Sequence, residues 1–176
     1  GRTDPLPRDE DFDKMAATAK TEPEQVQDDL AAAIAVLRER TGTEDVVVVG
    51  FCFGGTNAYL SAANDALGLA GVVAFYGGLT PDRFGYPHPV TKAAEMHGPI
   101  LGLFGEGDAS IPAERVSEFG AALAGAGVHH EFHGYPDAPH GFFDHGLEAF
   151  AGASQDAWER VLDFLGGIEA KAHATA

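Results

Sequence analysis

The sequence of 176 residues predicts an α/β fold, with a mostly parallel β-sheet flanked by helices. One observation behind this prediction is that short apolar runs alternate with amphipathic segments of helical period along the chain. A second is that Cys52, Asp108 and His140 each follow a predicted strand, and the carboxyl ends of parallel strands are where such sheets collect catalytic groups. No internal repeat or domain linker is apparent, so we treat residues 1–176 as a single domain.

The first predicted helix begins after a polar lead-in. Residues 1–18 lack periodicity and are expected to form a loop. Thr21 and Glu24 form a capping-box pattern, and Gly42 is expected to stop the helix that follows. The apolar residues on one face of this helix are Val26, Leu30, Ala33, Ile34 and Leu37.

A cysteine lies on a glycine-bounded turn after the first predicted strand. The run 46–49 consists of four valines, which suits a strand covered on both faces. Cys52 would sit at the apex of the turn that follows, where Gly50 and Gly54 avoid Cβ atoms that would collide and Gly55 eases the approach of strand and helix. The next helix carries Ala58, Tyr59, Ala62 and Ala63 on one face.

Two further strands and a helix follow. Residues 70–76 and 99–105 are expected to form buried strands, and the Gly- and Pro-rich segment 77–98 is expected to be a long loop. Ser110 and Pro112 can start the next helix. Its predicted core side is formed by Val116, Phe119 and Leu123.

Residues 128–133 show a period of two, which indicates a strand with one more exposed face near the edge of the sheet. One face would carry Val128, His130 and Phe132, and the other His129, Glu131 and His133. Gly166 and Gly167 are expected to close the last helix. The apolar residues that support that helix are Leu147, Phe150, Ala151, Trp158, Val161, Leu162 and Leu165. Only four good strands are predicted, so one side of the sheet would be an open apolar edge.

Charge and composition exclude several classes of protein. The formal charge is −16, with 27 acidic and 11 basic residues, so nucleic acid and anionic membrane surfaces are unsuitable partners. No apolar run reaches the ~20 residues that a membrane helix requires. A single cysteine cannot form an internal disulfide, so we expect a reducing compartment and a cytoplasmic protein.

The setting of Cys52 favours a nucleophile over a buried apolar residue. A lone cysteine is most often a small buried hydrophobe. An ordinary thiol has a pKa of ~8.5 and is only slightly ionised at neutral pH, whereas the thiolate is the reactive form. The glycine-bounded turn places the sulfur near a helix N-terminus, where the helix dipole favours a thiolate.

Asp108 and His140 complete the chain order of nucleophile, acid and histidine that α/β hydrolases use. Asp137 is a competing acid, but its YPDAP context favours a turn, and Glu106 is a weaker candidate. His145 could line the mouth of a pocket. No spacing suggests a metal cluster, and packing or surface roles are expected for His129, His130 and His133.

Together, the segments GFCFGG, GEGDASIP and PHGFF resemble the dienelactone hydrolase family of α/β hydrolases, and the resemblance covers nearly the whole chain. It implies a hydrolase in which His140 helps to form the Cys52 thiolate, Asp108 orients His140, and the thiolate attacks an ester or lactone carbonyl to give a thioester. The resemblance also implies that the backbone N–H of Phe53 supplies half of the oxyanion hole. We expect neither a cofactor nor a metal ion.

The resemblance also predicts what lies outside this sequence and what the substrate is. The family's opening strands, which carry the other oxyanion donor, are absent, so we expect a carboxyl-terminal portion completed by a missing amino-terminal segment or a second chain. Arg2 could match an arginine that binds an anionic lactone, but Asp144 stands where another arginine is expected. A neutral small ester or lactone is therefore favoured. Tyr76 and Phe142 are candidate pocket walls.

Two other functions remain open at this point. The chain could be a non-catalytic hydrolase-like domain used for binding or assembly, in which case Cys52 would resist alkylation at neutral pH. A serine esterase that uses Ser61 or Ser110 is the weaker alternative, because neither serine lies on a glycine elbow.

Overall fold

The sheet has four parallel strands in the order β1-β2-β3-β4, which confirms the predicted α/β class. The computed structural model describes residues 13–80, 86–144 and 147–175. The strand bounds are Val47–Phe51 for β1, Gly71–Phe75 for β2, Ile100–Gly105 for β3 and His130–Tyr135 for β4. Each strand pairs with the next one in the sequence, so all four carboxyl ends lie at the same edge of the sheet.

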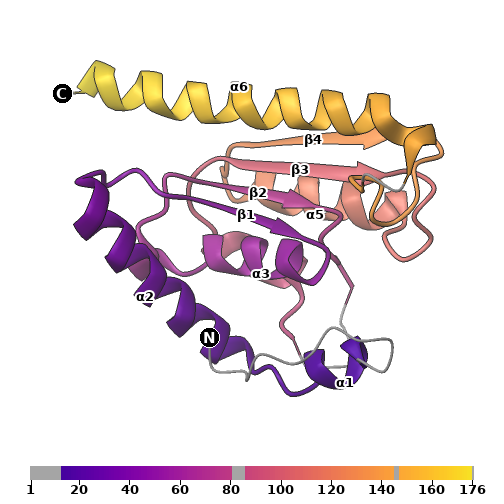
Figure 1. Ribbon diagram of the computed structural model, residues 1–176, viewed down its shortest axis with the longest axis horizontal. Coiled ribbons are helices and arrows are strands. Elements are labelled where there is room, and N and C mark those ends of the chain that lie inside the picture. The colour runs from indigo at the N-terminus through magenta and orange to yellow at the C-terminus, as the bar shows by residue number, and fades with distance from the viewer. Residues whose placement is uncertain (1–12, 81–85, 145–146, 176) are drawn as a thin grey trace.

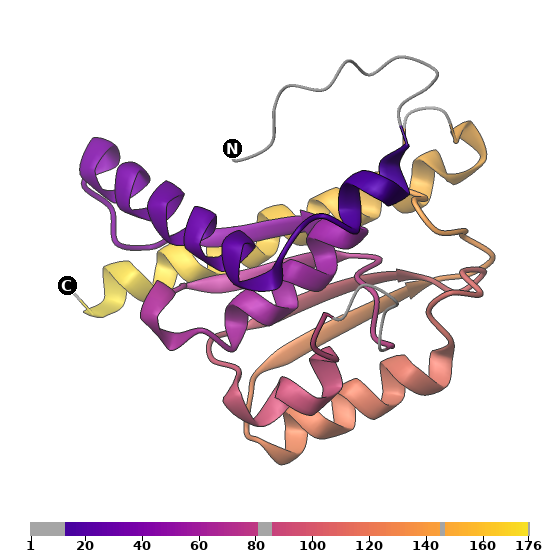
Figure 2. The ribbon, with the colours of Figure 1, turned by 90° about the horizontal axis from the view of Figure 1, so that it is seen from below.

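Helices cover both faces of the sheet. The helix α6 (Ala151–Thr175) crosses one face, while α3 (Phe53–Ala62) and α5 (Ala113–Gly125) pack on the opposite face (Figures 1 and 2). The α3 and α5 helices meet through the rings of Tyr59 and Phe119, whose centroids are 5.0 Å apart. No helix in the described ranges is both long enough and apolar enough to cross a membrane.

The middle strands form the centre of the core. Every residue of β2 and of β3 is buried, as expected for parallel strands that are covered on both faces. The helix α2 (Pro23–Thr41) packs separately, through Ile34 against Val46 and Leu67. Its predicted apolar face is only partly covered: Val26 and Leu30 are half-buried, whereas Ala33 is exposed and Leu37 retains 48% of its surface.

The first strand lies at an open edge of the sheet. On its free side β1 pairs with no strand among the described residues. Val49 and Phe51 are 40% and 41% exposed, so β1 is not covered on both faces as the valine run suggested. The prediction of an open apolar edge is confirmed at β1, and β4 lies at the opposite edge as its alternation indicated.

The start of the chain differs from prediction in two ways. A short helix, α1 (Lys14–Thr18), forms inside the expected loop. The capping box is wrong, because Glu22 is the N-cap of α2 without a side-chain bond and the Thr21 hydroxyl donates to the Ala17 carbonyl instead. The stop at Gly42 is confirmed, since this residue has φ 70° and its N–H donates to the Arg38 carbonyl.

The later connections also differ from prediction. The expected loop 77–98 contains the helix α4 (Pro89–Lys92) and a 3₁₀ turn, η2 (Ala93–Glu95). The stop at Gly166 and Gly167 is wrong, because α6 continues through both to Thr175. A glycine costs a helix about 1 kcal/mol relative to alanine but keeps its backbone donor, so a helix anchored by packing can continue through it. The remaining 3₁₀ turns are η1 (Asp65–Leu67) and η3 (Glu148–Phe150).

Candidate active site

The cysteine sits on a strained turn between β1 and α3. Cys52 has φ 54° and ψ −117°, a left-handed conformation that non-glycine residues rarely adopt. Its N–H donates to the Phe75 carbonyl at 3.0 Å, and its carbonyl accepts from the Thr56 N–H at 3.1 Å. The turn is therefore fixed to β2 on one side and to the helix on the other, and Cys52 remains exposed.

Two glycines permit this turn, although not the predicted pair. A Cβ at Gly50 would overlap the Gly54 carbonyl and lie 2.8 Å from the Gly55 nitrogen. A Cβ at Gly55 would lie 2.7 Å from the Phe75 carbonyl oxygen. A Cβ at Gly54 would meet no atom of the described residues within 4 Å, so the steric role predicted for Gly54 belongs to Gly55.

The aspartate lies in the loop that follows β3. The Asp108 side chain is 3% exposed, and its two oxygens have different partners. Oδ2 accepts from His140 Nδ1 at 2.6 Å, while Oδ1 accepts from the Ser110 N–H at 2.9 Å and from the Ser110 hydroxyl at 2.5 Å. Since a carboxylate only accepts, Nδ1 of His140 carries the proton in this pair.

The histidine joins the aspartate to the cysteine. His140 follows β4, and its Nε2 lies 3.1 Å from the Cys52 sulfur. Its ring contacts the ring of Tyr76, with a centroid separation of 5.1 Å. The structure thus brings Cys52, His140 and Asp108 into one hydrogen-bonded line at the carboxyl edge of the sheet.

The loops after β3 and β4 are bonded to each other. The Glu106 N–H donates to the Tyr135 carbonyl at 2.9 Å, and the Gly107 N–H donates to the Ala138 carbonyl at 3.0 Å. A Cβ at Gly107 would lie 2.7 Å from the Asp137 carbonyl oxygen, so the close approach requires glycine there. These contacts hold the acid and the base in register before any substrate binds.

The predicted binding residues fall in different places. Tyr76 is buried beside His140, and burial, with electrostatic contributions from Cys52 and Asp144, raises the pKa of its hydroxyl to about 12. Phe142, the other predicted pocket wall, is fully buried against the rings of Tyr76 and Tyr135. Arg2 lies outside the described residues.

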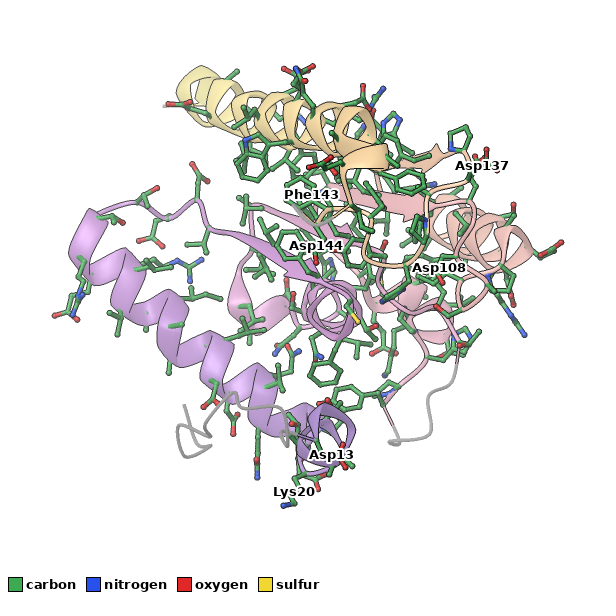
Figure 3. The ribbon with its side chains drawn as sticks, turned by 45° about the vertical axis from the view of Figure 1, so that its right-hand side comes forward. Asp13, Lys20, Asp108, Asp137, Phe143 and Asp144 are labelled. Atoms are coloured by element: carbon green, nitrogen blue, oxygen red, sulfur yellow. The ribbon has the colours of Figure 1, made fainter. Side chains whose placement is uncertain are left out.

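The rival acids Asp137 and Glu106 are not part of the hydrogen-bonded chain of Cys52, His140 and Asp108. Asp137 is exposed in a turn with φ 57°, and Figure 3 shows it at the periphery, apart from Asp108. Glu106 is exposed as well and lies beside Gly134. His145 falls outside the described residues. Within the described ranges, no three His, Cys, Asp or Glu side chains are grouped to hold a metal ion.

The serine alternatives are not placed for attack. Ser61 is buried on α3 and donates to the Ala58 carbonyl at 2.7 Å. Ser110 points its hydroxyl at Asp108 rather than at His140. Sequence reasoning assigned Ser110 to the start of a helix and missed this contact, although a serine two residues after an aspartate is a pattern that forms local side-chain turns.

An aromatic surface beside the cysteine was also missed. Phe51 stacks on Phe75 with a centroid separation of 4.6 Å and lies 5.8 Å from Phe143, which lies 6.2 Å from Trp158. Phe51 and Trp158 remain 41% and 44% exposed. Figure 3 shows Phe143 and Asp144 beneath the first turns of α6. These ring contacts join Phe51 to Trp158, more than 100 positions later in the sequence, so no local sequence pattern could reveal the aromatic surface.

Comparison with known proteins identifies the family. The model of the dienelactone hydrolase family matches residues 1–168. The chain belongs to the dienelactone hydrolase family. A Yersinia pestis protein named carboxymethylenebutenolidase is 38% identical over 126 residues, which are 70% of this chain and 47% of that protein. A Methylorubrum extorquens protein of the same name is 37% identical over 147 residues, 80% of this chain and 50% of that protein.

A solved structure supports the same assignment. The crystal structure of a Klebsiella pneumoniae protein described as a dienelactone hydrolase superposes with a TM-score of 0.75 at 32% identity, over 83% of this chain and 62% of that one. The chain spans about half the length of the curated dienelactone hydrolase relatives it matches.

Proposed function

We propose that the chain carries the catalytic triad of an ester or lactone hydrolase that uses Cys52 as its nucleophile. The observation that supports this most is the line of contacts from Asp108 to His140 at 2.6 Å and from His140 to Cys52 at 3.1 Å. His140 takes the thiol proton at Nε2 and becomes an imidazolium that the Asp108 carboxylate stabilises. The thiolate then attacks the substrate carbonyl.

The rest of the reaction follows from the same groups. Attack forms a tetrahedral oxyanion, and its collapse breaks the bond to the leaving oxygen, which takes the proton from His140. The product of this half is a thioester on Cys52. Water, deprotonated by His140, attacks the thioester and releases the acid and the thiol. Phe53 begins α3, so its N–H is available at the helix N-terminus as an oxyanion donor, and such a donor is worth about 3 kcal/mol.

A neutral substrate suits this site better than an anionic one. Asp144 and the thiolate of Cys52 act on the same buried hydroxyl of Tyr76, so both negative charges lie close to the reaction centre. The exposed rings of Phe51 and Trp158 offer an apolar surface beside them. An anionic ester would meet repulsion from Asp144, and Asp144→Asn would relieve it. A comparison of a neutral and an anionic ester of the same alcohol, with and without this substitution, tests the preference.

We further propose that another strand pairs with the open side of β1. It would come from an amino-terminal segment or from a second chain, and it would cover Val49 and Phe51 and bring the second oxyanion donor. Because a working thiol must stay reduced, we expect the protein to act in a reducing compartment such as the cytoplasm.

The alkylation rate of Cys52 tests the proposed nucleophile without depending on a known substrate. Iodoacetamide should modify Cys52 at pH 7 at least about tenfold faster than it modifies free cysteine, because only the thiolate reacts. His140→Ala should remove this advantage, whereas His130→Ala should leave it unchanged, since His130 bonds to the Val128 carbonyl away from the site.

Turnover provides the second arm of the test. Cys52→Ala should abolish hydrolysis of small activated esters by the folded protein. Unaltered hydrolysis after this substitution would refute the mechanism. A folded wild type whose Cys52 resists iodoacetamide would instead support a non-catalytic binding or assembly domain, for which the exposed edge of β1 is the specific observation.

A further inference from the structure

Ser110 occupies the side of Asp108 that faces away from the histidine. Its hydroxyl and its backbone N–H both donate to Oδ1, at 2.5 and 2.9 Å, while Oδ2 accepts from His140. Every one of these bonds uses the same carboxylate, whose side chain is 3% exposed. Rotating the carboxylate would therefore break bonds on both of its oxygens at once.

The hydroxyl of Ser110 is not used to start the helix that follows. Pro112 is the N-cap of α5 and makes no side-chain cap bond, so the helix begins without help from Ser110. The backbone on either side is held independently, because the Asp108 N–H donates to the Gly105 carbonyl at 3.2 Å and the Ile111 N–H donates to the Asp108 carbonyl at 3.1 Å. Loss of the hydroxyl would thus remove one of the two donors to Oδ1 while leaving the loop in place.

We propose that Ser110 is a positioning residue for the triad, an inference that rests on the proposed function. Its two donors fix the rotation of the Asp108 carboxylate so that Oδ2 stays on His140 Nδ1. The fixed carboxylate holds the His140 ring through Nδ1, so that Nε2 is directed at the Cys52 sulfur. Ser110 touches none of the reacting atoms, so it acts through Asp108 and His140.

The expected effect is a moderate loss of rate with substrate binding unchanged. Ser110→Ala removes one hydrogen bond to a charged group and leaves the backbone donor in place. Because Ser110 is exposed, water can replace part of the lost bond. We expect the rate of Cys52 alkylation at pH 7 and kcat for an activated ester both to fall about tenfold, with KM unaltered.

A set of variants isolates the hydroxyl. Ser110→Thr keeps the hydroxyl oxygen and should retain most of the wild-type rate. Ser110→Val has the shape of the threonine variant without its oxygen and should react at the same rate as Ser110→Ala. This Thr and Val pair also carries the test if the alanine variant does not fold. Ser117→Ala is the matched control, since Ser117 is an exposed serine on α5 and should leave the rate unchanged.

A double-mutant cycle shows whether Ser110 acts through Asp108. In an Asp108→Ala background, Ser110→Ala should cost less than about twofold in alkylation rate, since the side chain that Ser110 holds is gone. A tenfold loss in that background would overturn the assignment, as would equal rates for the Thr and Val variants. A wild-type Cys52 no more reactive than free cysteine would overturn the proposed function as well. A fast wild type with an unchanged Ser110→Ala would overturn only the role of Ser110.

Discussion

The substitution Gly50→Ala, compared with Gly54→Ala, tests how the elbow is built. An added Cβ at Gly50 would lie 2.8 Å from the Gly55 nitrogen and closer still to the Gly54 carbonyl. Ordinary contact begins near 3.4 Å, so the backbone of α3 would have to retreat from β1 by at least about 0.6 Å. Both partners are backbone atoms in a helix, and no side chain can rotate to relieve the overlap.

We expect Gly50→Ala to lower the free energy of unfolding by about 3 kcal/mol, the upper part of the usual range for overpacking. The displaced helix carries Cys52 away from His140, so the alkylation rate should fall about 100-fold. Gly54→Ala adds the same methyl group where no described residue lies within 4 Å and improves helix propensity, so stability should rise by up to about 1 kcal/mol. The reactivity of Cys52 should be retained.

Urea denaturation followed by circular dichroism measures the first quantity, and the iodoacetamide rate measures the second. If Gly54→Ala were as damaging as Gly50→Ala, the steric account of the elbow would be wrong. A tolerated Gly50→Ala with normal Cys52 reactivity would refute it equally.

Three further substitutions probe single contacts. The Tyr59 hydroxyl is buried with no hydrogen-bond partner among the described residues, so Tyr59→Phe should stabilise the fold by about 1 kcal/mol in urea denaturation; a loss of stability would reveal a hidden partner. The Arg38 guanidinium donates to the carbonyls of Glu44, Leu67 and Gly68, at 2.7 Å in the last case, so Arg38→Ala should cost about 1 to 2 kcal/mol and Arg38→Lys should recover little of it. Burial and the nearby Arg115 lower the pKa of His88, whose Nδ1 accepts the Val90 N–H at 3.1 Å. The unfolded chain therefore binds this proton more readily, and stability should fall as the pH drops below about 6.5. His88→Asn keeps a capping acceptor that does not titrate, so the stability of this variant should depend less on pH between 5 and 7; an unchanged pH dependence would exclude His88 as the source.

The four strands and the grouping of Cys52, His140 and Asp108 could be predicted because the sequence patterns that indicate them are local. The strands β1, β2 and β3 are short apolar runs, and β4 follows a period-two alternation. Cys52, Asp108 and His140 each lie within a few residues of a strand end. Parallel pairing then brings those ends together whatever the details of packing. Asp137 could be set aside in the same way, because a turn is a property of neighbouring residues.

Features that depend on distant contacts could not be predicted. The sequence indicates that Gly55 eases the approach of a strand and a helix, but nothing near the cysteine reveals that the Phe75 carbonyl on β2 is the group that requires it. Phe142 packs against Tyr135, at the end of β4, and against the distant Tyr76, which directly follows β2. The length of α6 follows from packing that overrides two glycines, since Ala157 and Val161 anchor it to the core.

The bonded loops after β3 and β4 also bear on how the site assembles and opens. Asp108 and His140 are 32 residues apart, whereas His140 and Cys52 are 88 residues apart. Closing the longer loop costs roughly 0.9 kcal/mol more in chain entropy, and the cysteine end of it rests on an edge strand. Local opening of β1 would therefore take away the nucleophile while the acid and the base stay paired. Conditions that speed the hydrogen exchange of the β1 amides should accordingly slow the alkylation of Cys52.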